Sequence, residues 1–201
     1  SASPKGTYAG IVPVDFAGRS VNMQAFKILA AEFDLWIIED ACHAPGGYFT
    51  DGEGKKQNCG NGKFADLSIF SFHPVKHIAC GEGGMITTNN KALYDKLLQL
   101  RTHGITRNNQ LFVNSKELAA GNTSEPVSDY PGWYMEMQEL GYSYRLTDFQ
   151  AALGISQLTQ AESGLERRKQ IARNYENAFK GKSWLFGQSG FIDGHAFHLY
   201  I

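Results

Sequence analysis

The chain has 201 residues, of which 42% are hydrophobic and 19% are charged, a balance typical of a folded globular protein. Its 19 lysines and arginines nearly offset its 20 aspartates and glutamates, so it lacks the basic field that attracts nucleic acid or an anionic membrane. Three cysteines without a CxxC pair and no apolar run of about 18 residues lead us to expect a cytoplasmic protein without disulfides or membrane spans.

The first part of the chain alternates between predicted strands and helices. A short apolar run at residues 11–14 precedes a helical pattern at residues 23–33, for which Ser20 or Asn22 is a candidate cap. Residues 35–38 are continuously apolar, as in a strand that is buried in a parallel sheet. A strand, a helix and a second strand make a βαβ unit, which indicates an α/β fold.

The middle of the chain continues this alternation after a long loop. Residues 45–63 are rich in glycine, aspartate and asparagine, which predicts a loop with a small hairpin near Asp51. The patterns at residues 64–72 and 85–88 predict two further strands. A helix follows and is expected to end at Gly104.

Regular periodicity is lost and then returns in the last part of the chain. The polar composition of residues 105–131 predicts a surface segment. Thr147 and Gln150 have the spacing of a capping box at the start of a helix, and a long amphipathic helix is expected from about residue 162 to 179. The final residues, 194–201, read GHAFHLYI and predict a strand.

One lysine stands in an unusual context. In the stretch SIFSFHPVKHIACGEGGM, Lys76 follows a predicted strand and precedes glycines that allow a close approach between backbone and ligand. Ligands of open α/β sheets collect at the carboxyl ends of the strands, where Asp40 also falls. A lysine beside an anion that Ser71 helps to hold is able to form a Schiff base with a carbonyl compound. The alternative interpretations are a solvated surface lysine for Lys76 and, for Asp40, a carboxylate at a strand end that caps nearby backbone amides.

Other chemistries receive less support. His73 and His77 stand four residues apart, as in a helical zinc pair, but Pro74 lies between them and no HExxH pattern is present. We therefore predict no metal site, with a zinc hydrolase kept as a distant alternative. The GEGG segment matches neither a Walker loop nor GxGxxG, so nucleotide hydrolysis and hydride transfer are not supported.

Four motifs in order, IIEDACHA, SIFSFHPVKHIACGEGGMITTN, RTHGITR and ELGYSYRLTDFQAALGISQL, resemble the DegT/StrS family of sugar-nucleotide aminotransferases. The resemblance runs from about Val12 to the end of the chain. It implies the large domain of a fold-type I transferase that depends on pyridoxal 5′-phosphate (PLP), with a mixed, mostly parallel sheet, flanking helices and a homodimeric assembly. The FHPVKHI and MQELGYxYRLTD versions look most like the branch that aminates UDP-linked 4-keto-6-deoxy-N-acetylhexosamines for pseudaminic acid.

The resemblance also implies a domain organisation. Family members extend beyond this chain at both ends, so the chain is expected to be a fragment. Residues 1–158 would form part of the PLP-binding large domain. Residues 159–201 would form a connecting helix and the start of a small domain.

The family's cofactor residues carry over by position. Lys76 matches the lysine that binds PLP covalently and moves the proton to the sugar. Asp40 matches the carboxylate that keeps the pyridine nitrogen protonated, and Ser71 matches the hydroxyl that binds the phosphate. His43 falls where the family has a residue near the cofactor ring.

Three further positions are expected to complete the site. Arg145 lies in the stretch that reaches the other subunit's site, and we assign it with His73 to the substrate. Ser143 stands where the family usually has asparagine in GYNYR, and it is expected to donate to a partner's cofactor phosphate with altered reach.

The implied reaction is a transamination in which glutamate gives its amino group through PLP to a 4-keto-6-deoxy sugar nucleotide. Dehydrases of the family carry histidine in place of the lysine, so Lys76 favours amino transfer. The alternative is a catalytically inactive remnant that keeps only a binding or dimerisation role.

Overall fold

The computed structural model describes residues 6–123, 125–185 and 192–201 of the chain. The backbone forms two compact units. The first contains Ser1–Asn90 and Leu146–Ile201, and the second contains Lys91–Arg145. The division into domains that was expected near residue 158 stays a prediction.

The first unit is built on a four-stranded sheet with the strand order β1-β2-β5-β6. Three neighbouring strands are parallel, and the fourth is antiparallel to β5. The strands are β1 (Gly10–Ile11), β2 (Trp36–Asp40), β5 (Leu67–Ser71) and β6 (Gly84–Thr87). The sheet is therefore mixed and mostly parallel, as predicted.

Helix α1 (Met23–Phe33) joins β1 to β2 and completes the predicted βαβ unit. Of the two expected caps, Asn22 is the one observed, because its Oδ1 accepts a hydrogen bond from Ala25 N at 3.2 Å. Met23 of α1 and Ile37 of β2 belong to one buried apolar cluster. Burial of these side chains holds the helix against the sheet.

A small hairpin follows β2, as predicted. It pairs β3 (Tyr48–Thr50) with antiparallel β4 (Lys56–Asn58). The Asp51 carboxylate accepts hydrogen bonds from Glu53 N and Lys55 N at 3.0 and 2.9 Å, so the side chain stabilises the connecting turn.

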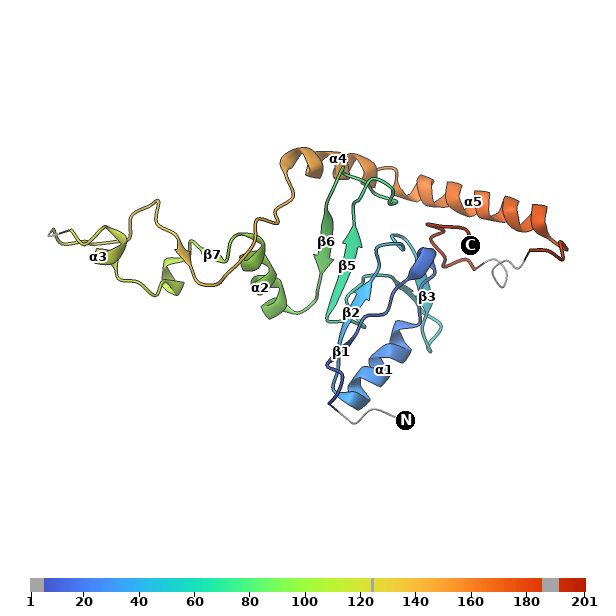
Figure 1. The fold of residues 1–201 in the computed structure, drawn as a ribbon, viewed down its shortest axis with the longest axis horizontal. Coiled ribbons are helices and arrows are strands. Elements are labelled where there is room, and N and C mark those ends of the chain that lie inside the picture. Colours follow the sequence, from blue (N-terminus) through green and yellow to red (C-terminus); the bar gives the residue numbers. More distant parts are fainter. Residues whose placement is uncertain (1–5, 124, 186–191) are drawn as a thin grey trace. The chain divides into compact units, whose positions relative to one another are not determined.

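The helices α4 (Asp148–Leu158) and α5 (Ala161–Phe179) also belong to the first unit. Thr147 and Gln150 form the predicted capping box at the start of α4. Figure 1 shows both helices at the end of the sheet where β5 ends and β6 begins. No helix within the described ranges is both long and apolar enough to cross a membrane.

The strand predicted at residues 194–201 is wrong. Phe197 has a φ of 48°, a left-handed conformation that an extended strand does not accommodate. The backbone N–H groups of Ala196 and Leu199 donate to the carbonyls of Gly18 and Ala17 at 2.7 and 3.1 Å. The segment is therefore a bent loop that lies on the turn η1 (Phe16–Gly18).

The second unit begins with the predicted helix, α2 (Lys91–Arg101), which is closed at Gly104. Gly104 has a φ of 67°, and its N–H donates to the carbonyl of Gln99. The segment expected to be irregular contains short elements, namely β7 (Ile105–Thr106), η2 (Asn109–Leu111) and α3 (Lys116–Ala119). β7 pairs with antiparallel β8 (Glu136–Met137).

Candidate functional site

The carboxyl ends of β2 and β5 lie at one edge of the sheet. Asp40 is the last residue of β2, and in the parallel register it pairs with Ile69 of β5. Ser71, the last residue of β5, lies two positions further along that strand, and the loop after it carries Lys76. The fold thus gathers an acid, a hydroxyl and an amine at the edge where α/β proteins bind their ligands.

Asp40 is held by three hydrogen bonds. Its N–H donates to the Pro13 carbonyl at 2.8 Å, and its carbonyl accepts from Asp15 N at 3.0 Å. Its Oδ1 accepts from Cys42 N at 3.1 Å. These contacts fix the carboxylate at the end of the strand.

The charges of Asp40 and Lys76 both shift the pKa values of two side chains, Cys42 and His43. Burial and, after it, the Asp40 carboxylate raise the pKa of the Cys42 thiol to about 12, while the Lys76 charge opposes the rise. Burial and the Lys76 charge lower the pKa of His43, and Asp40 acts in the opposite direction. Both charges therefore act in the region of Cys42 and His43, although Asp40 and Lys76 lie far apart in sequence.

The loop that carries Lys76 is closed at its base. Phe72 N donates to the Gly83 carbonyl at 2.8 Å, and Cys80 N donates to the Phe72 carbonyl at 3.0 Å. At the start of the loop, Ser71 Oγ accepts a hydrogen bond from His73 N at 3.3 Å, which leaves the hydroxyl hydrogen available to a ligand.

His73 lies on the exposed side of this loop. Its Nε2 lies 3.9 Å from Glu82 Oε1, and its Nδ1 accepts a weak hydrogen bond from Val75 N at 3.4 Å. The backbone N–H of Lys76 donates to the His73 carbonyl at 2.9 Å. The turn from His73 to Lys76 is thus ordered by its own backbone.

Three imidazole rings lie together beside Lys76. The ring centroids of His43 and His198 are 4.4 Å apart in a stacked arrangement, and those of His77 and His198 are 5.4 Å apart. Burial lowers the pKa of His77 and of His198 to about 4, so both rings are neutral at neutral pH. The sequence analysis missed His198, because nothing near it in the sequence distinguishes it from a core residue.

A second group of polar side chains is buried close to the end of β2. Ligand atoms of Asp15, Glu39 and Cys59 lie within 4.8 Å of one another. Glu39 accepts hydrogen bonds from Gly60 N at 3.0 Å and from Ser68 Oγ at 2.8 Å. The three residues come from distant segments of the chain, which explains why the sequence pattern did not reveal the group. The predicted absence of a metal site stays a prediction.

Asp15 is the least satisfied member of that group. It is fully buried, and its Oδ1 accepts from Val21 N at 2.8 Å. Its Oδ2 makes no hydrogen bond with any part of the chain that the structure describes. Burial raises the pKa of Asp15 to about 6, as expected for a carboxylate without a compensating cation.

A cavity of about 380 Å³ lies next to the lysine loop. Its walls include His77 from that loop, and Leu165 and Arg168 from α5. Arg168 donates to the His198 carbonyl at 3.3 Å. The cavity therefore borders the histidine group from the side of α5.

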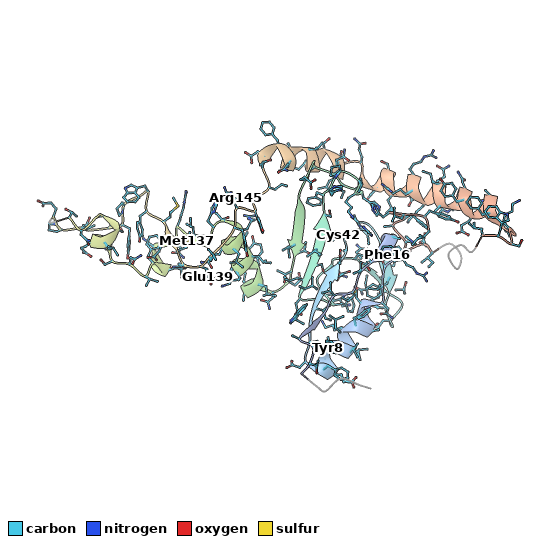
Figure 2. The ribbon with its side chains drawn as sticks, in the orientation of Figure 1. Tyr8, Phe16, Cys42, Met137, Glu139 and Arg145 are labelled. Atoms are coloured by element: carbon cyan, nitrogen blue, oxygen red, sulfur yellow. The ribbon has the colours of Figure 1, made fainter. Side chains whose placement is uncertain are left out.

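The other two predicted site residues, Ser143 and Arg145, are exposed and belong to the second unit. Ser143 forms an antiparallel bridge with Thr102. Tyr142 and Tyr144, on either side of Ser143, stack with ring centroids 4.6 Å apart. Arg145, which follows Tyr144 in the sequence, is labelled in Figure 2. The relation of Ser143 and Arg145 to the lysine loop stays a prediction.

Comparison with known proteins shows a family match across almost the whole chain. The model of the DegT/DnrJ/EryC1/StrS aminotransferase family matches residues 4–201. A UDP-4-amino-4,6-dideoxy-N-acetyl-beta-L-altrosamine transaminase from Campylobacter jejuni is 41% identical over 167 residues, which are 83% of this chain and 37% of that protein. The sequence predicted both the family and this branch.

Solved structures of aminotransferases also match almost the whole chain. The aminotransferase PseC from Helicobacter pylori, involved in the biosynthesis of pseudoaminic acid, matches 96% of this chain and 44% of its own with a TM-score of 0.75 and 29% identity. The PLP form of the putative sugar aminotransferase Spr1654 from Streptococcus pneumoniae matches 96% of this chain and 46% of its own with a TM-score of 0.69 and 25% identity. These matches confirm the predicted fold class. The chain spans less than half the length of these relatives.

Proposed function

Because the chain belongs to the DegT/DnrJ/EryC1/StrS aminotransferase family, we propose that the protein it represents is a sugar-nucleotide aminotransferase that uses PLP. The observation that carries this proposal is the position of Asp40 at the end of β2 and of Lys76 in the loop after β5, because these two strands pair in parallel and end at the same edge of the sheet. We further propose glutamate as the amino donor and a UDP-linked 4-keto-6-deoxy sugar as the acceptor. The likeness to the Campylobacter transaminase supports that acceptor class.

The side chains at this edge fit the chemical groups of PLP. When bound, PLP supplies a carbonyl carbon that reacts with amines and a pyridinium ring that accepts electrons. Lys76 offers an amine for the carbonyl carbon, and Asp40 offers a carboxylate for the pyridinium nitrogen. Ser71 offers a hydroxyl for the phosphate, and His43 an imidazole near the ring.

Asp40 acts by holding a negative charge in a fixed place. The hydrogen bond from Cys42 N to its Oδ1 at 3.1 Å restricts the rotation of the carboxylate. An ionised and oriented carboxylate favours the protonated form of a nitrogen beside it. We therefore assign to Asp40 the maintenance of the proton on the ring nitrogen.

Lys76 acts as the group that moves a proton. Its loop is tied at the base by the backbone contacts of Phe72, so the amine stays close to the end of β5. Because His43 and His198 are neutral neighbours, neither competes with the amine as a cation. We assign to Lys76 Nζ the covalent attachment of the cofactor and the delivery of a proton to C4 of the sugar.

The remaining assignments concern binding. We propose that His73, half exposed on the lysine loop, contacts the substrate. Ser143 and Arg145 are assigned to the site of a partner subunit in a homodimer, where a hydroxyl and a guanidinium suit phosphate oxygens.

An amino-transfer assay tests this function. Because the chain spans less than half of its relatives, the assay uses the complete reading frame that contains it, with PLP, glutamate and a panel of 4-keto UDP- and dTDP-sugars. We expect one 2-oxoglutarate for each amino sugar formed. Lys76→Ala should abolish repeated turnover, whereas Lys55→Ala, which changes an exposed lysine that pairs with Glu53, should not.

Two results would count against the proposal. If no sugar in the panel is aminated although the protein binds PLP, the sugar acceptor is wrong. If the protein folds and stays colourless with added PLP, the family member is a non-catalytic remnant.

A further inference from the structure

The strained turn η1 presents a backbone N–H to the ring of His43. Ala17 in this turn is 1% exposed and has a φ of 59°, a left-handed conformation that residues other than glycine adopt at a cost. Its N–H donates to His43 Nδ1 at 3.3 Å. A strained backbone conformation persists where the surrounding structure fixes it. Here the conformation of Ala17 directs its N–H toward the imidazole of His43.

That hydrogen bond selects one tautomer of His43. A nitrogen that accepts a hydrogen bond carries no proton, so in the neutral ring the proton lies on Nε2. Burial and the charge of Lys76 lower the pKa of His43, which keeps the ring neutral. His43 therefore offers an N–H donor from Nε2.

His198 covers the face of the same ring. The two rings stack with centroids 4.4 Å apart and an angle of 26° between their planes. Such a contact restricts the tilt of His43, on which the hydrogen bond from Ala17 depends. Because the pKa of His198 is also lowered, the stack joins two neutral rings.

Contacts that do not involve His43 hold His198 in place. Ala196 N and Leu199 N donate to the carbonyls of Gly18 and Ala17, and Arg168 donates to the His198 carbonyl at 3.3 Å. A Cβ on Gly18 would lie 2.9 Å from His198 N and 2.8 Å from the His43 carbonyl. Glycine at position 18 thus permits the close approach of the three segments.

We propose that His198 is a positioning residue for His43, holding its ring so that Ala17 N–H fixes the neutral tautomer with the proton on Nε2. The site thereby gains one directed hydrogen-bond donor beside Lys76. The inference rests on the proposed function for the identity of the acceptor, an oxygen of the bound cofactor.

The tautomer is measured directly by nitrogen NMR on cofactor-free protein labelled with ¹⁵N-histidine. His43→Gln identifies the His43 signals. In the wild type we expect Nδ1 in the unprotonated range and Nε2 in the protonated range. His198→Ala should move both signals toward the average of two tautomers, and His198→Phe, which keeps a flat ring for stacking, should preserve them. His103→Asn in the second unit, where the φ of 59° suits asparagine, is the control.

Cofactor affinity gives a second readout. We expect the dissociation constant for PLP to rise roughly tenfold in His198→Ala and to recover in His198→Phe, as for the loss of one hydrogen bond. A wild-type His43 protonated on Nδ1, or a folded His198→Ala with unchanged His43 signals, would overturn the inference. If His198→Ala fails to fold, the His198→Phe variant decides: averaged His43 signals in that variant would overturn the inference. A failure to bind PLP affects only the proposed function, because the tautomer is read without cofactor.

Discussion

The charges of Asp40 and Lys76 shift the pKa of the His43 imidazole in opposite directions: Lys76 lowers it and Asp40 raises it. The arrangement follows from the parallel pairing of β2 and β5, which brings the ends of two strands to the same edge. A carboxylate, a neutral imidazole and an amine at one edge of the sheet have the chemistry that the proposed binding of a charged heterocycle with a carbonyl group requires.

Replacing the charge of Asp40 should impair turnover far more than stability. In Asp40→Asn the amide keeps an acceptor for Cys42 N, but the negative charge is lost. For a charge pair in a partly buried site we expect a loss in kcat on the order of a hundredfold or more, measured with saturating PLP. Asp34→Asn is the control, because Asp34 is an exposed residue after α1 in a left-handed conformation that asparagine adopts readily. An equal effect in both variants would contradict the role given to Asp40.

The same substitution should make the Cys42 thiol more reactive. Asp40 raises the pKa of Cys42 and Lys76 lowers it, so removal of the Asp40 charge leaves the lysine unopposed. Because the thiolate is the reactive form, alkylation of Cys42 by iodoacetamide at pH 8 should be faster in Asp40→Asn than in the wild type. Peptide mass spectrometry of the cofactor-free protein measures the rate at Cys42 alone. An unchanged rate would mean that burial alone determines the pKa.

Much of the first unit could be predicted because its signals are local. The cap of α1, the capping box of α4 and the strand β2 lie within short windows of sequence, and all three are observed. The burial predicted for the whole apolar run of β2 is wrong at Trp36, which is exposed. The C-terminal segment misled the prediction, since its apolar residues are buried by packing of a bent loop on η1 and not by pairing in a sheet. Local pattern alone does not distinguish these two ways of burying apolar residues.

In the candidate site, too, residues with local sequence signals were predicted and residues placed by contacts between distant segments were not. The sequence motifs indicated Asp40, Ser71 and Lys76, each at the end of a predicted strand or just beyond it. They did not indicate His198 or Asp15, which reach the site region through contacts between distant segments. Such residues become visible only when the fold places them side by side.

The buried Asp15 should make stability depend on pH. Its folded-state pKa of about 6 lies above the ordinary 3.8, so the folded protein binds this proton more tightly than the unfolded chain. Its contribution to stability is therefore present in full below about pH 4 and is lost as the pH rises through 6, by about 3 kcal/mol in total.

Asp15→Asn tests this dependence. The amide keeps the acceptor for Val21 N and carries no charge, so the free energy of unfolding at pH 8 should rise by about 1–3 kcal/mol. Urea titrations from pH 4 to pH 8 measure the effect. Glu53→Gln, which changes an exposed carboxylate, should leave the pH profile as in the wild type. A profile for Asp15→Asn with the wild-type slope would show that Asp15 does not titrate in this range.

The capping box of α4 should contribute measurably to stability. Thr147 Oγ1 accepts from Gln150 N, and Gln150 Oε1 accepts from Thr147 N. Thr147→Ala removes one of these contacts and should lower the free energy of unfolding by about 1 kcal/mol, whereas Thr147→Ser should preserve it. Urea denaturation of the two variants gives the comparison. Equal stability of the alanine and serine variants would contradict the importance of the cap.

Reductive labelling tests whether Lys76 binds PLP covalently, as proposed. The complete protein is incubated with PLP, reduced with borohydride and digested, and its peptides are analysed by mass spectrometry. We predict a visible absorbance band that borohydride abolishes and one pyridoxyl group on the peptide that contains Lys76, with neither in Lys76→Ala. A label on other lysines while the Lys76 peptide stays unmodified would show that Lys76 is not the residue that attaches PLP.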